Sequence, residues 1–552
     1  MFYPAASLRN LPPKEERKYS FLEAVPSRTT AFAHVYSERR SGTGAMFKKI
    51  LIANRGEIAV RVMRTCREMG IRTAAVYSDA DRTALHVRAA NEAYSIGPAP
   101  STESYLNIPR ILDAARRSGV EAIHPGYGFL SENPEFARAV EAAGMTFIGP
   151  PAAAMELLGS KTASRRLAAG RGLPVVPGAV HNLESLDDVA RLAEEYGYPI
   201  MIKASEGGGG KGLRLVRSGA ELQSAYRAAR SEAERAFGSP AVYIEKYLER
   251  PRHVEIQVLG DRAGRLIYLG ERECSLQRRH QKVMEECPSP IVDEALRRKM
   301  GETAVRIAQT AGYSNAGTVE FLLDGDRNFY FLEMNTRLQV EHPVTEQVYG
   351  LDLVRKQIEV AAGQPLSLSQ EDLRPRGCAI ECRIYAEDPS NHFFPSPGLI
   401  TGLERPSGPG VRDDSGVTAG WRVPLEYDAL LAKLIVWAED RPGAIARLGR
   451  ALGEYDVRGI QTNLPFFRRV VEHPDFAAGQ IDTEFIDRML SAQADWEEPA
   501  MEGETAAAML AATVAAMRQE APKPARQPTD QPSAWKTAGR EALLCAWPER
   551  RR

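Results

Sequence analysis

Between residues 46 and 143 the chain alternates short apolar runs with longer stretches in which apolar residues recur every three or four positions. This rhythm predicts, in order, strand 49–53, helix 57–69, strand 73–77, helix 108–117, strand 121–124 and helix 136–143. Alternating strands and helices indicate an α/β fold with a doubly wound parallel sheet. The first turn, residues 54–57, lacks the G-x-G-x-x-G fingerprint that a dinucleotide-binding fold usually carries there.

A strict period-two pattern runs from residue 332 to residue 341. Its odd positions are polar, namely Glu333, Asn335, Arg337, Gln339 and Glu341, and its even positions from 332 to 340 are apolar or threonine. Period two predicts an extended segment with two distinct faces. The polar face can hold a cation, hold an anion and move a proton. A half-buried strand with a solvated polar face is the alternative for this pattern taken alone.

A second predicted strand, residues 317–323, precedes this segment and is joined to it by the turn 324–328. Two strands with a short glycine-containing connection form a hairpin. Counting back from the turn, Glu320 lies within one residue of facing Glu333. Facing carboxylates repel unless a cation lies between them, and oxygen ligands suit Mg²⁺ or Mn²⁺. The hairpin therefore favours a metal site over a solvated face.

Four consecutive glycines, Gly207, Gly208, Gly209 and Gly210, follow a buried strand that contains Lys203. Residues 213–217 predict another strand, so the helix that a Rossmann or P-loop motif requires is missing. A glycine loop between two strands can close its backbone N–H groups over phosphates, and Lys203 and Lys211 add positive charge. A flexible hairpin tip is the alternative.

Three further polar patterns lie near these motifs. A strand over 241–248 ends in Glu245 and Lys246, which suit a nucleotide or a solvated strand edge. A strand over 252–258 alternates so that one face carries His253, Glu255 and Gln257. A positive cluster that suits phosphate, bicarbonate or merely solvent comprises Arg278, Arg279, His280 and Lys282.

Composition and net charge mainly exclude classes of protein. A chain of 552 residues with 43% apolar and 26% charged residues predicts a globular protein of three or four domains. Its net charge of −1 gives no support for binding nucleic acid or a membrane surface, and no apolar window is long enough to cross a membrane. Six scattered cysteines fit a cytoplasmic protein. Cys274 is interpreted as a core residue rather than a nucleophile.

The two ends of the chain differ from the part between them. Residues 1–45 show no sustained periodicity, and we expect either disorder or a natural start at Met46. Residues 503–518 are rich in alanine and helical in pattern, and residues 521–533 are proline-rich and linker-like.

Together these motifs resemble those of the ATP-grasp enzymes, and over about residues 46–490 they closely resemble biotin carboxylase. The glycine loop and the run from Glu333 to Asn335 are shared with carbamoyl-phosphate synthetase. Segments 124–133 and 277–282 are far more specific to biotin carboxylases. The matching segments are 52–59, 124–133, 277–282, 333–337, 341–343 and 381–384.

The resemblance implies three folded domains between two extensions. These are an extension over 1–45, an N-terminal parallel-sheet domain over 46–158, an ATP-grasp domain over 159–378 with a small mobile lid at about 176–248, a strand-rich C-terminal domain of α+β character over 379–490, and an Ala/Pro-rich tail over 491–552.

The resemblance also implies roles for the matching residues. The implied ATP contacts are Lys161, Lys203, Glu245, Lys246, Leu248, His253, Gln277 and His280, with Gly207 to Gly210 as a lid loop. The implied metal ligands are Glu320, Glu333 and Asn335. The implied bicarbonate pocket is Lys282, Arg337, Gln339 and Val340. Glu341 is implied as the base that deprotonates bicarbonate, and Arg383 as the arginine that stabilises the biotin enolate.

The implied reaction uses ATP and Mg²⁺ or Mn²⁺ to convert bicarbonate into carboxyphosphate and then to carboxylate biotin. The chain has no Met-Lys pair of the kind that carries biotin, so we expect a separate biotin carboxyl carrier protein. Carboxyltransferase subunits and a homodimer complete the expected assembly. Acetyl-CoA, and hence fatty acid biosynthesis, is the expected destination, with propionyl-CoA, other acyl-CoAs and pyruvate left open. The rival hypotheses are a different ATP-grasp ligase and a regulatory subunit that binds a nucleotide without catalysis.

Overall fold

The computed structural model describes residues 45–179, 181–183, 185–205, 212–492 and 511. The chain divides into two units, residues 1–489 and residues 490–552, and the features below belong to the first. The tail and the N-terminal extension, on which predictions were made, lie outside the described residues. Among the helices that the structure describes, none is both long and apolar enough to cross a membrane.

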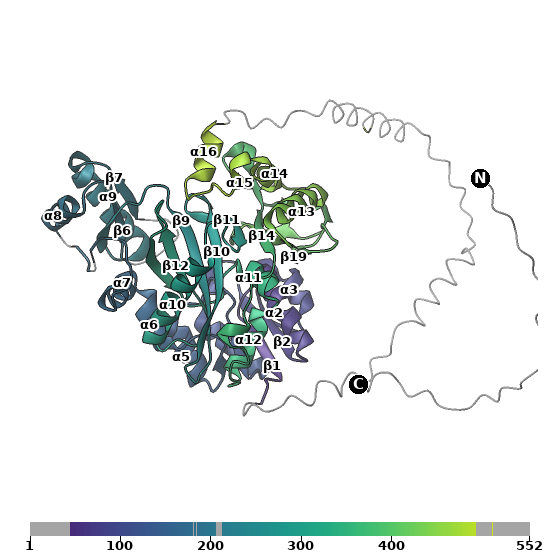
Figure 1. Ribbon diagram of the computed structural model, residues 1–552. Coiled ribbons are helices and arrows are strands. Elements are labelled where there is room, and N and C mark those ends of the chain that lie inside the picture. The colour runs from purple at the N-terminus through teal and green to yellow at the C-terminus, as the bar shows by residue number, and fades with distance from the viewer. Residues whose placement is uncertain (1–44, 180, 184, 206–211, 493–510, 512–552) are drawn as a thin grey trace, which may run out of the picture. The chain divides into compact units, whose positions relative to one another are not determined.

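The N-terminal part is a five-stranded parallel sheet in the order β3-β2-β1-β4-β5. Its strands β1 and β2 are labelled in the purple part of Figure 1. Ile50 and Ile52 of β1 enter one apolar core and Leu51 enters another, so helices pack on both faces. This arrangement confirms the expected doubly wound sheet. The elements are β1 Lys49–Ile52, α2 Gly56–Glu68, β2 Arg72–Ser78, α3 Leu85–Ala89, β3 Glu92–Gly97, α4 Ile108–Ser118, β4 Ala122–His124, α5 Pro134–Ala142 and β5 Thr146–Phe147. The sequence analysis did not predict α3, β3 and β5.

An eight-stranded antiparallel sheet in the order β13-β12-β9-β10-β11-β14-β21-β19 forms the centre of the unit. It is continuous across residue 378, where we expected one domain to end. Its strands are β9 Arg252–Gly260, β10 Leu266–Arg278, β11 Gln281–Cys287, β12 Asn315–Leu323, β13 Phe329–Asn335, β14 Cys378–Tyr385, β19 Val411–Ser415 and β21 Leu430–Ala438. Helix α10 (Glu294–Thr310) packs on it through Met300, Ala304 and Ile307.

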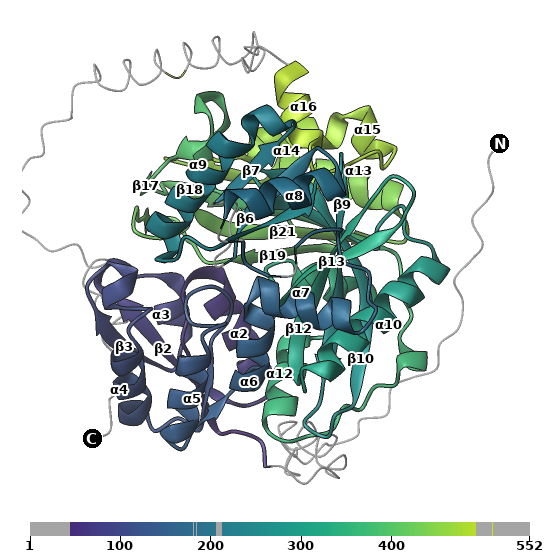
Figure 2. The same cartoon turned by 90° about the vertical axis from the view of Figure 1, so that its left-hand side faces the viewer.

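A separate three-stranded sheet, β7-β6-β8, carries the strands that flank the glycine loop. Helices α8 and α9 cover it and share its own apolar core, which includes Val189, Ile202 and Ile244 (Figure 2). Strands β6 and β7 pair antiparallel, as the predicted glycine-loop hairpin requires. The elements are α8 Leu186–Tyr196, β6 Ile200–Ala204, β7 Leu213–Val216, α9 Gly219–Phe237 and β8 Val242–Lys246. The glycines Gly207 to Gly210 lie outside the described residues.

The remaining elements connect and cover these sheets. The helices are α6 Ala152–Gly159, α7 Lys161–Gly170, α11 His342–Tyr349, α12 Leu353–Ala361, α13 Arg441–Glu454, α14 Leu464–Glu472, α15 Pro474–Ala477 and α16 Phe485–Ala492. The short 3-10 turns are η1 Asp79–Asp81, η2 Ser101–Glu103, η3 Gln370–Asp372 and η4 Pro389–Asn391. The small strands are β15 Glu387–Asp388, β16 Phe394–Pro395, β17 Gly398–Leu399, β18 Gly402–Glu404, β20 Arg422–Val423 and β22 Asp456–Arg458.

The extended conformation that was predicted from Glu333 to Glu341 is observed only up to Asn335. Strand β13 ends at Asn335, and Glu341 is already the residue that precedes helix α11. The chain leaves the sheet because the Thr336 N–H donates a hydrogen bond to the Glu132 carboxylate, at 2.8 Å, instead of pairing with a strand. Pro343 in the first turn favours the start of the helix. Residues 336–341 therefore form a loop between β13 and α11, which we call the anion loop.

Candidate active site

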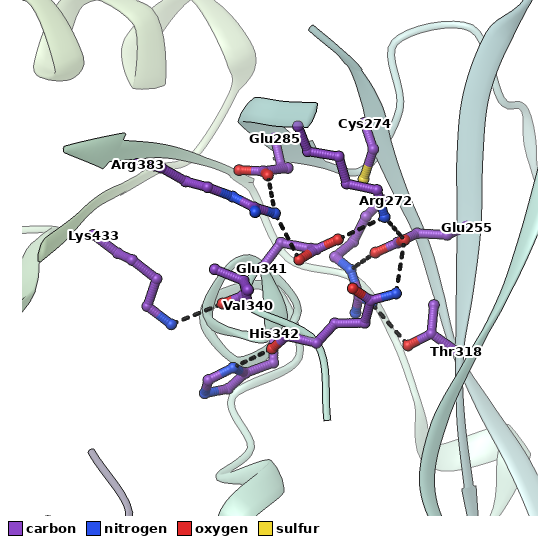
Figure 3. A network of polar contacts seen from close by, with 12 residues as sticks. Glu255, Arg272, Cys274, Glu285, Thr318, Val340, Glu341, His342, Arg383 and Lys433 are labelled. Carbon is purple, nitrogen blue, oxygen red and sulfur yellow. Dashed lines mark hydrogen bonds and ion pairs between the residues drawn. The ribbon is translucent and has the colours of Figure 1, made fainter. Parts of the chain in front are cut away.

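Charged side chains from five elements converge beside the anion loop (Figure 3). Glu255 comes from β9, Arg272 from β10, Lys282 from β11, Glu320 from β12 and Arg383 from β14. Because these strands are neighbours in one sheet, side chains that are far apart in the sequence lie close together. Glu341, at the end of the anion loop, completes the group.

The Lys282 ammonium lies among three carboxylates. Its Nζ donates hydrogen bonds to Glu255 Oε2 at 2.6 Å, to Glu320 Oε1 at 2.8 Å and to Glu341 Oε1 at 2.8 Å. Burial alone would lower the pKa of Lys282, but these three carboxylates raise its pKa well above the usual range. The lysine is therefore a permanent cation that holds the three acids together.

Glu341 is fully buried and ionised. Burial alone would raise its pKa, but Lys282, Arg383 and Arg272 together lower the pKa of Glu341 well below the usual range. The Arg383 Nη2 donates to Glu341 Oε2 at 2.9 Å. Arg337 is not one of these three cations, and its Nε donates to Glu132 Oε2 at 2.9 Å. A carboxylate in this state can accept a proton from a ligand.

The predicted metal ligands lie together on the β12–β13 hairpin. Glu320 and Glu333 are directly paired in register, as expected from the turn. The Asn335 side-chain amide donates to Glu320 Oε1 at 2.8 Å, and His253 Nε2 lies 3.0 Å from Glu320 Oε2. Burial would raise the pKa of Glu320, but Lys282 and His253 hold it well below the usual range. Two carboxylates and an amide oxygen are a donor set that fits Mg²⁺ or Mn²⁺.

The predicted nucleotide contacts occupy two groups. In the small sheet, Lys203 and Glu245 form an ion pair, and Glu245 also contacts Arg165. In the large sheet, His253 Nδ1 and Gln277 Nε2 lie 2.7 Å apart and join the metal group through Glu320.

The other predicted nucleotide contacts lie elsewhere in the described part, apart from Lys161. Lys246 donates to the carbonyls of Gly197 and Tyr198, at 2.9 and 3.0 Å. His280 is exposed in the β10–β11 turn. Leu248 is half-buried and lies after β8. Lys161 begins helix α7, and its side chain lies outside the described part.

The bicarbonate residues that we predicted are brought to one place by the anion loop. Gln339 Nε2 donates to Glu320 Oε1 at 3.0 Å, and Arg337 Nη2 donates to Asn335 Oδ1 at 3.0 Å. Lys282 is held at the same carboxylate, Glu320. The metal group and the anion group are thus directly hydrogen-bonded to each other.

Sequence reasoning missed Arg272, which is fully buried beneath the site. Its guanidinium donates to Glu255, to Gln257 Oε1 at 2.8 Å, to Thr345 Oγ1 at 2.9 Å and to Thr318 Oγ1 at 3.1 Å. An arginine amid a buried strand was the available signal, because such a charge requires partners. Arg272 fixes the Glu255 face of β9 and helps to keep Glu341 ionised.

Glu132 and Glu285 were also missed. Glu132 accepts from the Thr336 N–H and from Arg337, so it holds the start of the anion loop. Glu285 contacts the same Arg383 Nη2 that serves Glu341, at 2.5 Å. Burial raises the pKa of Glu285 to about 7 in spite of Arg383. Cys274, interpreted as a core residue, is fully buried, and burial raises its pKa well above the usual range, which disfavours a thiolate.

Three family models match consecutive parts of the chain. They are described as biotin carboxylase, N-terminal domain, over residues 46–155; carbamoyl-phosphate synthase L chain, ATP binding domain, over residues 160–369; and biotin carboxylase C-terminal domain, over residues 381–488.

Similar proteins include enzymes with different names. The chain is 52% identical over 443 residues to biotin carboxylase 1 of Bacillus subtilis, covering 80% of this chain and 98% of that one. It is 54% identical over 444 residues to a pyruvate carboxylase subunit of Methanothermobacter thermautotrophicus, covering 80% and 90%.

Solved structures of similar proteins contain nucleotides and bicarbonate. The Campylobacter jejuni biotin carboxylase complex with βγ-ATP matches with a TM-score of 0.78 at 48% identity, covering 80% of this chain and 99% of that one. The biotin carboxylase domain dimer of Hydrogenobacter thermophilus 2-oxoglutarate carboxylase, with MgADP, ADP and bicarbonate, matches with a TM-score of 0.80 at 47% identity, covering 82% and 100%.

Proposed function

We propose that this chain, which belongs to the biotin carboxylase family, uses ATP and bicarbonate to carboxylate biotin on a separate carrier protein. One observation above all supports this reaction. Glu341 is a buried, ionised carboxylate between Lys282 and Arg383, beside the candidate metal ligands. A base, an anion pocket and a metal site in contact are what phosphorylation and carboxyl transfer from bicarbonate require.

In this proposal the nucleotide lies between the small sheet and the β12–β13 hairpin. Its contacts are Lys161, Lys203, Glu245, Lys246, Leu248, His253, Gln277 and His280, under the loop of Gly207, Gly208, Gly209 and Gly210. Glu320, Glu333 and Asn335 would hold Mg²⁺ or Mn²⁺. A bound divalent cation neutralises charge on the transferring phosphoryl group. Lys203 would leave its ion pair with Glu245 in part to reach a phosphate.

Bicarbonate occupies the anion loop in this proposal. The planar guanidinium of Arg337 can hold the planar anion through two parallel hydrogen bonds, and Lys282, Gln339 and Val340 line the rest of the pocket. Glu341 takes the proton from bicarbonate, which then attacks the γ-phosphate to give carboxyphosphate and ADP. Because Glu341 keeps a low pKa beside Lys282, it remains a base at neutral pH.

Arg383 serves the second step. Carboxyphosphate breaks down to CO₂ and phosphate, the released phosphate takes the proton from the ureido nitrogen of biotin, and that nitrogen then attacks CO₂. The guanidinium of Arg383 stabilises the enolate form of biotin that results. Its position between Glu285 and Glu341 supports a shared location for both steps. Carboxyphosphate hydrolyses readily, so the loop over the phosphates must exclude water.

We propose acetyl-CoA as the final acceptor, with a biotin carboxyl carrier protein and carboxyltransferase subunits as partners and a homodimer as the assembly. Pyruvate carboxylase of the two-subunit kind is the second candidate, because a relative that is 54% identical is named as one of its subunits. Relatives named for propionyl-CoA and methylcrotonoyl-CoA carboxylases, each 51% identical, are nearly as similar. Capture of the carrier and carboxyltransferase subunits, followed by an acceptor screen, distinguishes these assemblies.

The proposed reaction is tested by ATP hydrolysis in the presence of bicarbonate, with and without free biotin or carrier protein. We expect biotin to stimulate hydrolysis and carboxybiotin to form. Glu341→Ala should still bind ATP but lose carboxylation, since it removes the base. The absence of any stimulation by biotin in the wild-type protein would favour another ATP-grasp ligase. Wild-type turnover in Glu341→Ala would remove Glu341 from its role.

A further inference from the structure

A lysine outside the proposed catalytic residues is fully buried behind the anion loop. Lys433 lies on β21, in register with Arg383 of β14 on one side and Asp414 of β19 on the other. Burying an ammonium group is costly unless it is paired or hydrogen-bonded. The partners of this charge therefore indicate why the lysine is there.

Lys433 reaches the anion loop directly. Its Nζ donates a hydrogen bond to the Val340 carbonyl oxygen at 2.7 Å, and Figure 3 shows the side chain extending to that residue. A hydrogen bond from a charged donor is stronger than one from a neutral donor. The loop has left the sheet at Asn335, so side chains must hold its backbone in place of strand pairing.

A carboxyl group of the N-terminal part, that of Glu57, lies beside Lys433. Its Oε2 lies 3.5 Å from Lys433 Nζ, and both of its carboxylate oxygens are buried without a hydrogen bond. Glu57 belongs to the first turn of α2, which approaches the strand ends closely. A Cβ added at Gly416, just after β19, would lie 2.4 Å from the Glu57 backbone nitrogen. Lys433 thus joins three parts of the fold: β21, the anion loop and the first turn of α2.

The bond to Val340 constrains Glu341 because the two residues share one peptide unit. The Val340 C=O and the Glu341 N–H lie in one plane and point in opposite directions. Fixing the carbonyl toward Lys433 therefore fixes the direction of the Glu341 N–H and the start of its side chain. On the other side of Val340, the Gln339 carbonyl is held by His342 Nδ1 at 2.8 Å. The backbone on both sides of Val340 is set by buried side chains.

We propose that Lys433 is a positioning residue for the carboxylation reaction, with the carboxyl group of Glu57 as its partner from the N-terminal part. Lys433 sets the backbone from Gln339 to Glu341 so that the bicarbonate pocket and the base are aligned. This inference rests on the proposed function. The proposed ATP contacts lie on other strands, so losing Lys433 should impair bicarbonate use and spare ATP binding.

The test compares Lys433→Met, which removes the donor and the charge at similar length, with Lys433→Gln, which keeps a neutral donor. In the full chain we expect Lys433→Met to raise the KM for bicarbonate about tenfold or more, since 1.4 kcal/mol corresponds to tenfold. The KM for ATP should stay within about twofold. More ATP should be hydrolysed per carboxybiotin formed, and Lys433→Gln should recover part of the loss.

A matched control separates positioning from general loss of stability. Arg297→Met removes a half-buried cation on α10, which pairs with the buried carboxylate of Glu271 and makes no contact with the anion loop among the described residues. It should lower the melting temperature and leave the KM for bicarbonate unchanged. An unchanged KM for bicarbonate in folded Lys433→Met, or an equal rise in both KM values, would overturn the proposal.

Two further measurements keep the outcome interpretable. If Lys433→Met does not fold, Glu57→Gln replaces it and should raise the KM for bicarbonate about twofold to fivefold, because it replaces the carboxyl group that lies 3.5 Å from Lys433. No rise in Glu57→Gln would then contradict the inference. The wild-type protein in the same assay tests the proposed function itself, so a failure of that function is seen before any variant is compared.

Discussion

At the scale of single residues, Glu320 carries the densest set of interactions in the site. Lys282, Asn335 and Gln339 all donate to its Oε1, while His253 lies at its Oε2. Glu320→Gln would remove the charge that faces Glu333 while keeping the shape. We expect the metal concentration for half-maximal rate to rise about tenfold, as for the loss of one charged ligand contact. Titrating Mg²⁺ against rate, and Mn²⁺ against a binding signal, measures this. An unchanged midpoint in both would show that Glu320 is not a ligand.

Glu57 makes a prediction about pH. Burial raises the pKa of Glu57 from 4.5 to about 7, although Lys433 opposes the shift. The folded chain then holds this proton more tightly than the unfolded chain does. The stability that it contributes is complete below pH 4.5 and is lost between pH 4.5 and about 7, by roughly 3 kcal/mol at most. The glutamine side chain in Glu57→Gln has no proton to lose in this pH range. The melting temperature of the variant, relative to that of the wild type, should therefore rise as the pH rises from 5 to 8. A difference that stays constant with pH would contradict the shift.

Residue types and spacing were sufficient to select Glu320, Glu333 and the polar run that contains Glu341 as chemistry-bearing positions. They could not select Arg272, Glu132 or Lys433. Each of these three acts through a contact with a distant segment, such as Lys433 with Val340, and the sequence does not indicate which segments meet. Family resemblance supplied the roles at the matching positions, whereas Arg272, Glu132 and Lys433 were identified from their contacts in the structure.

At the scale of elements, the turn before α2 and the end of β19 are in close backbone contact. Gly416→Ala would place its Cβ 2.4 Å from the Glu57 nitrogen, an atom that cannot move without shifting the helix. We expect the free energy of unfolding to fall by about 1–3 kcal/mol, as it does when a core is overpacked. Gly453→Ala is the matched control, because it lies within α13 with nothing within 4 Å of the added Cβ. The control should gain up to about 1 kcal/mol from helix propensity. Thermal unfolding of both variants measures the contrast, and equal effects would exclude the close contact.

Most of the strands and helices that periodicity did predict end within two residues of the observed bounds, but the prediction failed where the anion loop leaves the sheet. Alternation continues from Glu333 to Glu341 although pairing stops at Asn335. Gln339 and Glu341 are nevertheless buried, since the loop folds back onto charged partners such as Glu320 and Lys282. An alternating pattern shows which positions need partners. It cannot show that those partners are side chains and not strands.

At the scale of the whole molecule, the small sheet β7-β6-β8 has its own apolar core and carries Lys203 and Glu245. A unit with its own core exchanges its amide hydrogens cooperatively. We therefore expect β6 and β8 to exchange together, and to slow together when a non-hydrolysable ATP analogue and Mg²⁺ are added. Hydrogen exchange followed by mass spectrometry measures this. Lys203→Met should reduce the protection, and protection confined to the large sheet would place the nucleotide elsewhere.

The eight-stranded sheet limits where this protein can be divided into fragments. The boundary that we proposed at residues 378 and 379 falls at the first residue of β14, and β14 pairs with β11 from Met284 to Cys287. Cutting the chain there would leave two long unpaired strand edges, which invite aggregation. The two parts are consecutive in the sequence, but they share one sheet and are not independent domains. Any exchange of residues 379–490 between related proteins, by recombination or by design, has to carry the neighbouring strands of this sheet with it.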